Sequence, residues 1–172
     1  APGISTNYIK KMLDKNCPVI RVMPNTPLLV GKGASALSKS QEVNDAQLKI
    51  VKDIFASSGE VHELDESQMD SIVAVNGSSP AYVYLFAKAM CDYATSENIN
   101  QKTAMDLICK TLEGSAEMLR SAGHTPDELI KMVCSPNGTT ERAIKSLEAG
   151  HFYETIQQAM RECTRRAHEL SL

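Results

Sequence analysis

Residues 80–94 constrain the fold of this chain more than any other segment, because they are almost wholly apolar. Lys88 and Asp92 are the charged residues of the run, and its apolar members include Tyr82, Val83, Leu85, Phe86, Ala87, Ala89, Met90 and Cys91. A helix that is apolar on every side is buried on every side. The run is too short for a membrane span, which needs ~20 residues. A small domain can rarely enclose such a helix alone, so the sequence predicts that a second chain covers it.

The chain changes character near residue 64. Up to that point helical and strand-like segments alternate, as in an incomplete βαβ arrangement of the α/β class. The expected elements there are a helix over 5–14, strands at 17–23, 34–37 and 61–64, and a helix that begins at Asn44. From Asp65 onward the periodic segments are helical. We therefore predict two domains, 1–64 and 65–172, in a protein that is mostly helical overall.

Three further helices are expected in the second domain. Thr125, with Pro126 after it and Glu128 three residues on, is a typical helix start. The predicted inner faces are Ala104, Leu107, Ile108, Thr111, Ser115, Met118, Leu119 and Ala122 in one helix, and Ile156, Ala159, Met160, Cys163, Ala167 and Leu170 in the last. Within its stripe, Thr111 is expected to bond a carbonyl one turn earlier, so we assign it no catalytic role.

Composition narrows the class of partner. Eighteen basic and 21 acidic residues give a net charge of −3, which argues against nucleic acid or an anionic membrane as the main partner. The five cysteines form no CxxC or CxxH pair, so neither a zinc site nor a disulfide framework is indicated. Reduced, buried thiols in a cytoplasmic protein are the simpler interpretation. The four histidines are far apart in the sequence, and no metal site is predicted.

The loop Pro24-Asn-Thr-Pro27 is the first candidate site. It follows the strand at 17–23, and its two prolines fix their own backbone and bias the residues before them towards extended geometry. Exposed Asn25 and Thr26 side chains at the carboxyl end of a strand could bond a cofactor amide or ribose. In open α/β sheets, that edge is where ligands bind. The alternative is a strand that the prolines simply terminate.

Two later turns are also candidates. Ser135-Pro-Asn-Gly-Thr-Thr140 precedes an amphipathic segment, so helix-start N–H groups and hydroxyls could bind a carboxylate there. An ordinary capped turn explains the same residues. Gly77, in Asn76-Gly-Ser-Ser-Pro-Ala-Tyr82, allows close approach of either another helix or a planar ligand, and packing is the plainer explanation.

In this order and spacing, the motifs closely resemble those of the pyrroline-5-carboxylate reductase family. The resemblance covers essentially the whole chain. The residues that carry it are Arg21–Pro27 with Gly31 and Gly33, Gly77–Tyr82, Thr111–Met118, Ser135–Thr140, and Leu147-Glu148 with Gly150 and Phe152.

The resemblance implies a Rossmann-like domain, of which 1–64 is the remnant, followed by an all-α dimerisation domain. It implies hydride transfer from NADPH or NADH to 1-pyrroline-5-carboxylate, an imine carboxylate, giving L-proline. It implies a homodimer through residues 66–172 and allows a higher oligomer. The implied cofactor-binding residues are Met23, Pro24, Asn25, Thr26, Pro27 and Pro80. The implied substrate-binding residues are Ser135, Asn137, Gly138, Thr139 and Thr140, with Thr140 in the catalytic role near the ring nitrogen.

The sequence also departs from the family pattern. Asn137 stands where Gly is usual, and Asn is the next-best residue if the position needs a positive φ. Glu141 replaces a typically apolar residue and should weaken anion binding if it points towards the loop. The family's Gly-rich pyrophosphate turn does not occur in the sequence. We therefore expect a C-terminal piece that lacks about the first hundred family residues and is inactive alone.

Two other functions fit the same residues. One is a non-catalytic helical dimerisation module, which the missing Gly-rich turn and Glu141 favour. The other is a paralogous reductase of a related cyclic imine acid. The retained Ser-Pro-x-Gly-Thr-Thr loop favours an enzyme.

Overall fold

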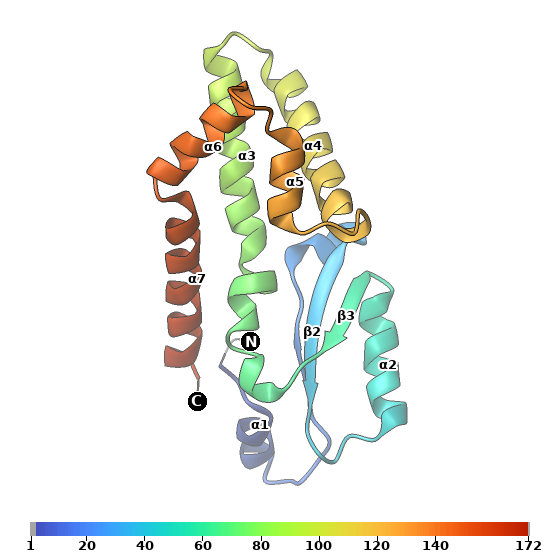
Figure 1. Cartoon of the computed structure of the whole chain (residues 1–172). Helices are drawn as coiled ribbons and strands as arrows, with labels where there is room; N and C mark the ends of the chain where they lie inside the picture. The colour runs from blue at the N-terminus through green and yellow to red at the C-terminus, as the bar shows by residue number, and fades with distance from the viewer. Residues whose placement is uncertain (1–2, 172) are drawn as a thin grey trace. The chain divides into compact units, whose positions relative to one another are not determined.

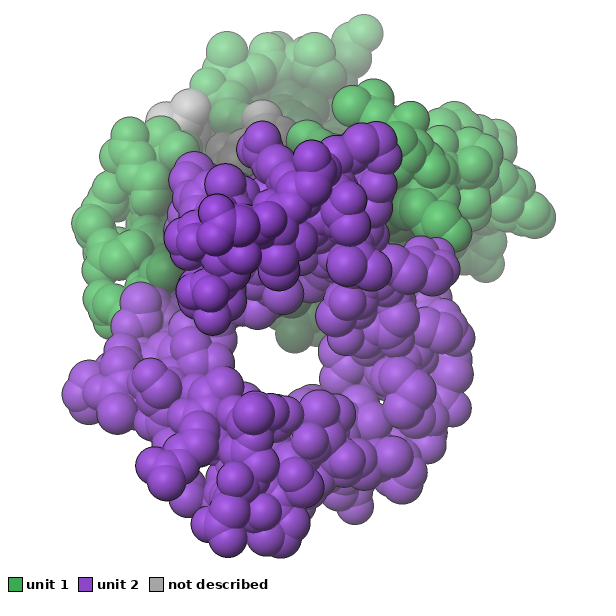
Figure 2. Space-filling model, turned by 90° about the horizontal axis from the view of Figure 1, so that it is seen from above, with its two compact units in different colours: residues 1–82, 157–172 green, residues 83–156 purple. Residues whose placement is uncertain are grey.

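The computed structural model describes residues 3–171, which divide into two compact units. Unit 1 comprises residues 1–82 and 157–172, and unit 2 comprises residues 83–156 (Figure 2). The helices and strands in chain order (Figure 1) are α1 (Thr6–Leu13), β1 (Ile20–Met23), β2 (Gly33–Lys39), α2 (Asp45–Ala56), β3 (Gly59–Glu63), α3 (Ser79–Ser96), α4 (Gln101–Ser121), α5 (Pro126–Val133), α6 (Thr139–Ala149) and α7 (Phe152–Glu169). The expected fold class, a small sheet followed by helices, is confirmed.

The unit division does not coincide with the expected boundary at residue 64. It falls within α3 and within α7, so the C-terminal part of α7 belongs to the unit that holds the sheet. Each unit is therefore described by itself. The two-domain division at 64/65 stays a prediction.

The sheet in unit 1 has the order β1-β2-β3. β2 and β3 are parallel, with Gly33 opposite Gly59, and α2 connects them, so the expected βαβ unit is confirmed. β1 runs antiparallel to β2, with Met23 opposite Ala36. The carboxyl end of β1 thus lies at the amino ends of β2 and β3. The rule that ligands bind at the carboxyl ends of parallel strands therefore does not select the loop after β1 within this sheet.

β1 is shorter than expected and begins at Ile20 rather than Cys17. Pro18 has no N–H to give to a ladder. The next N–H, that of Val19, donates to the side-chain Oγ of Ser40 at 3.1 Å, while the Ser40 N–H donates to the Val19 carbonyl. A side chain thus replaces one backbone partner, which ends the regular pairing.

One apolar core of unit 1 lies between the sheet and α2. It is formed by Leu37, Val43 and Leu48, and Leu37 is fully buried. α2 begins with the expected capping box: Asn44 Oδ1 accepts from the Gln47 N–H at 2.9 Å, and Gln47 Oε1 accepts from the Asn44 N–H at 3.0 Å. The local cap and the long-range core therefore fix the same helix.

A second core of unit 1 joins segments that are far apart in the sequence. Its buried members are Met23, Ala36, Met69, Val73 and Ala167. Beside it, buried Arg21 donates to Asp70 at 2.5 Å.

Asp70 has further partners near the end of the chain. Its carboxylate accepts from the Ser171 hydroxyl at 2.8 Å and lies 3.5 Å from His168 Nδ1. Burial opposes ionisation of Asp70, but the Arg21 and Ser171 hydrogen bonds outweigh it and hold its pKa below the usual range. This cluster connects β1 with the C-terminal end of α7.

Unit 2 has a much smaller apolar core. Its buried residues are Ala87, Cys91, Ala104 and Ile108, where α3 meets α4. α5 begins with the expected capping box at Thr125, and the Thr111 hydroxyl donates to the Leu107 carbonyl at 2.8 Å, as predicted. Figure 2 shows an opening bordered by atoms of unit 2.

The apolar helix over 80–94 is not buried on every side within this chain. Val83, Tyr84, Leu85 and Phe86 are 42–69% exposed, although they follow one another around the helix. The predicted inner face of α4 is likewise only partly right, because Leu107, Met118 and Leu119 are exposed. Both findings are those expected when apolar side chains lack the chain that would cover them.

The expectation of buried thiols is wrong for most cysteines. Cys91 is buried, Cys109 is exposed, and Cys17, Cys134 and Cys163 are half-buried. Cys109 follows buried Ile108 on α4 and so faces away from the apolar stripe. In the described part of the chain, no helix is long and apolar enough to span a membrane.

Candidate functional site

The loop after β1 is held against β2 by a side chain. Asn25 lies opposite Ala34, and its Oδ1 accepts from the Ala34 N–H at 2.9 Å. The side-chain oxygen of Asn25 thus supplies the acceptor that a backbone carbonyl would supply in a regular ladder. Asn25 is thus half-buried and internally engaged, contrary to the expected exposed side chain, whereas Thr26 is exposed.

Asn76 holds the same corner from the other side. Its Nδ2 donates to the carbonyls of Met23 at 2.8 Å and Ala34 at 3.0 Å. Both backbone groups of Ala34 therefore bond asparagine side chains. Asn76 Oδ1 is buried and has no hydrogen-bond partner among the described residues. Two asparagine side chains therefore hold the strand exit, and Asn76 Oδ1 there stays unpaired.

Gly77 and Pro80 lie in the turn that follows. A Cβ added at Gly77 would lie 3.5 Å from the Met23 Sδ, which is an ordinary van der Waals distance. Contacts within the chain therefore do not by themselves require glycine there. Pro80 is half-buried in the first turn of α3.

The loop between α5 and α6 is a tight turn. The Gly138 N–H donates to the Ser135 carbonyl at 2.9 Å, with Pro136 second and Asn137 third in the turn. Asn137 has φ 57°, so the position does adopt the positive φ for which Asn is the next-best residue after glycine. A Cβ added at Gly138 would collide with the Ser135 hydroxyl. The turn thus needs glycine at 138 and a residue tolerant of left-handed geometry at 137.

The start of α6 presents the remaining candidates. Gly138 is its N-cap, and Thr139 and Thr140 form the first turn, Thr139 exposed and Thr140 half-buried. The first N–H groups of an α-helix have no partner inside the helix, and the helix dipole favours an anion there. The start of α6 therefore combines the hydroxyls of Thr139 and Thr140 with backbone N–H groups that have no partner inside the helix.

Glu141 points at this loop. Its Oε2 accepts from the Asn137 N–H at 2.6 Å, and its Oε1 lies 2.7 Å from Lys145 Nζ. The ion pair with Lys145 and the Asn137 N–H hold the pKa of Glu141 below its usual value. The Asn137 N–H, one of the expected substrate donors, is thus already occupied in this conformation.

The structure brings the candidate residues together as two groups. Met23, Pro24, Asn25, Thr26, Pro27 and Pro80 belong to unit 1, and Ser135, Asn137, Gly138, Thr139 and Thr140 belong to unit 2. In unit 1, the Asn76 bond to Met23 connects the loop with the segment that precedes Pro80. In unit 2, the residues lie within one turn and the helix start that follows it.

Comparison with known proteins decides the family. The model for pyrroline-5-carboxylate reductase dimerisation matches residues 66–170. The chain belongs to the pyrroline-5-carboxylate reductase family. It is 39% identical to the pyrroline-5-carboxylate reductases of Corynebacterium melassecola and of Pseudomonas aeruginosa, and in both cases the alignment covers 99% of the chain.

Solved structures agree with this assignment. The pyrroline carboxylate reductase of Plasmodium falciparum, determined with NADP bound, superposes with a TM-score of 0.95 at 31% identity, over 99% of this chain and 69% of that one. The Coxiella burnetii reductase superposes with a TM-score of 0.91 at 36% identity, over 99% of this chain and 63% of that one. The chain spans 63% of the length of the Corynebacterium and Pseudomonas reductases.

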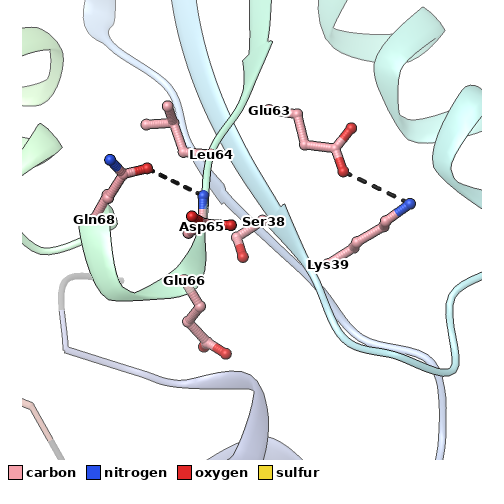
Figure 3. A pocket seen from close by; sticks show the side chains of 7 residues that line it. All are labelled: Ser38, Lys39, Glu63, Leu64, Asp65, Glu66 and Gln68. Atoms are coloured by element: carbon pink, nitrogen blue, oxygen red, sulfur yellow. Dashed lines mark hydrogen bonds and ion pairs between the residues drawn. The ribbon is translucent and has the colours of Figure 1, made fainter.

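A polar hollow of about 350 Å³ lies elsewhere in unit 1. It is at the carboxyl ends of β2 and β3, the opposite edge from loop 24–27, and is lined by Ser38, Lys39, Glu63, Leu64, Asp65, Glu66 and Gln68 (Figure 3). Glu63 pairs with Lys39 and Lys52, and Glu66 accepts from Thr6. No group of three or more metal-ligating side chains occurs among residues 3–171. The hollow contains none of the reductase motif residues.

Three features of this family member were missed at the sequence level. They are the Asn76 bonds to Met23 and Ala34, the Glu141 bond to Asn137, and the Arg21–Asp70 pair. An arginine within an otherwise apolar strand was a usable signal for the third, since a buried charge needs a partner. For the second, a glutamate at the third position of a helix was a signal for a bond back to the residues at the helix start. The first had no comparable signal.

Proposed function

We propose that this chain forms the substrate-binding and dimerisation part of an enzyme that reduces 1-pyrroline-5-carboxylate to L-proline, the last step of proline biosynthesis. The observation that carries the proposal is the preformed turn Ser135–Thr140 at the start of α6. It combines backbone donors, hydroxyls and a left-handed Asn137 within a chain of the reductase family.

The turn is suited to the carboxylate of a small imine acid. The N–H groups of Thr139 and Thr140 and the hydroxyl of Ser135 supply donors, and the dipole of α6 favours the negative charge. In this proposal the Thr140 hydroxyl contacts the substrate near its ring nitrogen. Gly138 contributes by allowing the turn to close over Ser135.

NADPH or NADH is the proposed cofactor, held by Met23, Pro24, Asn25, Thr26, Pro27 and Pro80. The loop fits a dinucleotide because it is rigid, Thr26 is exposed and Asn76 leaves a polar atom unpaired at the strand exit. When bound, the nicotinamide supplies the hydride that reduces the C=N carbon. The protein's residues then mainly bind and orient the reactants, and orientation alone can account for a large part of a rate enhancement.

We also propose that the working form is at least a homodimer through residues 66–172, in the cytoplasm. Support comes from the match to a dimerisation model and from the exposed apolar side chains of α3 and α4. In this assembly the 1–64 region is the C-terminal part of the nucleotide-binding domain, and 65–172 is the helical domain.

The test uses the chain extended at its N-terminus with the corresponding segment of the Corynebacterium relative. Reduction of 1-pyrroline-5-carboxylate is followed by NADPH absorbance. Thr140→Ala should lower kcat/KM roughly a hundredfold, by analogy with the loss of one polar donor to a transition state. Thr111→Ala is the matched control, because Thr111 bonds its own helix. Unchanged turnover in Thr140→Ala would refute the site.

The alternative is a dimerisation module without chemistry, and the occupied Asn137 N–H is the observation that favours it. The extended chain distinguishes the two, because a module would give no turnover with any cyclic imine acid. Turnover with a related imine acid, but not with 1-pyrroline-5-carboxylate, would identify a paralogous reductase instead.

A further inference from the structure

Glu141 stands at the third position of α6, where a glutamate often caps the start of a helix. In the usual arrangement it accepts from the N–H of the N-cap residue. Here the N-cap is Gly138, whose N–H already donates to the Ser135 carbonyl. Glu141 instead reaches one residue further and accepts from the Asn137 N–H at 2.6 Å.

The contact leaves the first-turn N–H groups of α6 uncapped and acts on the turn before the helix. Gly138 has no side chain to bond the first turn, and a larger residue would collide with Ser135. Asn137, with φ 57°, adopts the left-handed conformation, which residues with a side chain disfavour. A bond to its N–H therefore stabilises the strained residue of the turn.

The charge of Glu141 is largely balanced where it stands. Lys145, one helical turn later, lies 2.7 Å from the second carboxylate oxygen. Glu141 and Lys145 thus present a dipole, rather than a lone negative charge, to an approaching anion. The expected repulsion of a substrate carboxylate is reduced accordingly.

We propose that Glu141 is a positioning residue: it holds Asn137 in the left-handed conformation and so presents the first-turn donors of α6 to the substrate carboxylate. The inference rests on the proposed function of the Ser135–Thr140 turn. It assigns the loop's shape to a side chain that touches neither substrate nor cofactor.

The experiment measures binding of L-proline to the 172-residue chain by calorimetry. Glu141→Ala should weaken binding about five- to tenfold, within the range of one ordinary hydrogen bond, because the lost bond acts on the ligand only through the shape of the turn. Glu141→Gln, which can still accept from Asn137, should remain within about twofold. Lys145→Met leaves the charge of Glu141 unbalanced and should weaken binding without breaking the bond to Asn137. Asn137→Gly in the Glu141→Ala background should recover most of the loss, because glycine adopts positive φ freely.

A second readout follows the Asn137 amide proton by NMR. It should move upfield in Glu141→Ala and stay near its wild-type position in Lys145→Met. Equal or tighter L-proline binding by Glu141→Ala overturns the positioning role and indicates simple charge repulsion. Absence of saturable binding by the wild type refutes the proposed function together with this inference. An unmoved amide in Glu141→Ala refutes the contact and the positioning role with it, but not the proposed function.

Discussion

The two compact units of this chain differ in how far each encloses its own apolar side chains. Unit 1 has two cores, in which Leu37 and Met69 are fully buried. Unit 2 has one core of four residues, while four consecutive residues of α3 are 42–69% exposed. Unit 1 also exposes Ile50 and Ile54 on α2, but its two cores contain fully buried side chains. The difference indicates that unit 2 is completed by another chain.

The strongest test of this comparison is a charge on the exposed face of α3. Leu85 is 69% exposed, and Leu85→Glu should raise the dimer dissociation constant by about a thousandfold, because an unpaired charge is costly in an apolar interface. Ile54→Glu is the matched control on α2, where the side chain is 60% exposed. Analytical ultracentrifugation distinguishes them. Equal dissociation in both variants would contradict the contrast between the units.

The next test compares the cores. Leu37→Ala should lower the free energy of unfolding by about 3 kcal/mol, as expected for a buried leucine. Because Leu37 lies in a core completed within unit 1, the loss should not depend on protein concentration. Ile108→Ala, in the core of unit 2, should also lower the free energy of unfolding. Here the measured value should rise with protein concentration, because dimerisation stabilises unit 2. Urea unfolding at two protein concentrations distinguishes the two cases. If only the effect of Leu37→Ala depended on protein concentration, unit 1 rather than unit 2 would be the unit that another chain completes.

The features that the sequence predicted are local ones. The caps at Asn44 and Thr125 and the Thr111 back-bond each depend on residues within four positions of one another. In such cases neighbouring side chains decide the conformation, so the sequence itself carries the signal.

Most of the features that it did not predict involve distant partners, and the bond between Glu141 and the Asn137 N–H, four positions apart, is the exception. The antiparallel direction of β1 depends on its pairing with β2, and Asn76 meets Met23 across 53 positions. The candidate site divides in the same way: the turn residues were identifiable from their types, but not the side chains that hold them. For α3, the sequence predicted that a second chain covers the apolar residues. It could not predict which of these residues are exposed in one chain, because the atoms that would cover them belong to another chain.

A smaller effect is expected from the ion pair behind the second core of unit 1. Asp70→Asn should lower stability by about 2 kcal/mol at pH 7, because it leaves Arg21 buried without its countercharge. The folded-state pKa of Asp70 is depressed, so its contribution is present above the unfolded pKa of about 3.9 and is lost as pH falls through the folded value.

Urea unfolding at pH 7 and pH 3 therefore measures the Asp70 effect. The gap between wild type and Asp70→Asn should narrow at the lower pH. Asp106→Asn is the control in unit 2, where an exposed pair with Lys102 should contribute less than about 1 kcal/mol. A gap that widens on acidification would show that Asp70 does not carry the charge inferred from its contacts.

The smallest effect concerns the strand exit of unit 1. Asn25→Ala removes the bond to the Ala34 N–H and should lower stability by about 1 kcal/mol. Because the loop then loses its attachment to β2, amide hydrogen exchange at Ala34 should accelerate, while exchange in α4 stays unchanged. Asn16→Ala, an exposed asparagine before β1, is the control. If Asn25→Ala leaves the Ala34 amide protected, the prolines and Asn76 hold the loop. The proposed cofactor loop would then not depend on a single side-chain bond, as we infer for the turn in unit 2, where Glu141 bonds the Asn137 N–H.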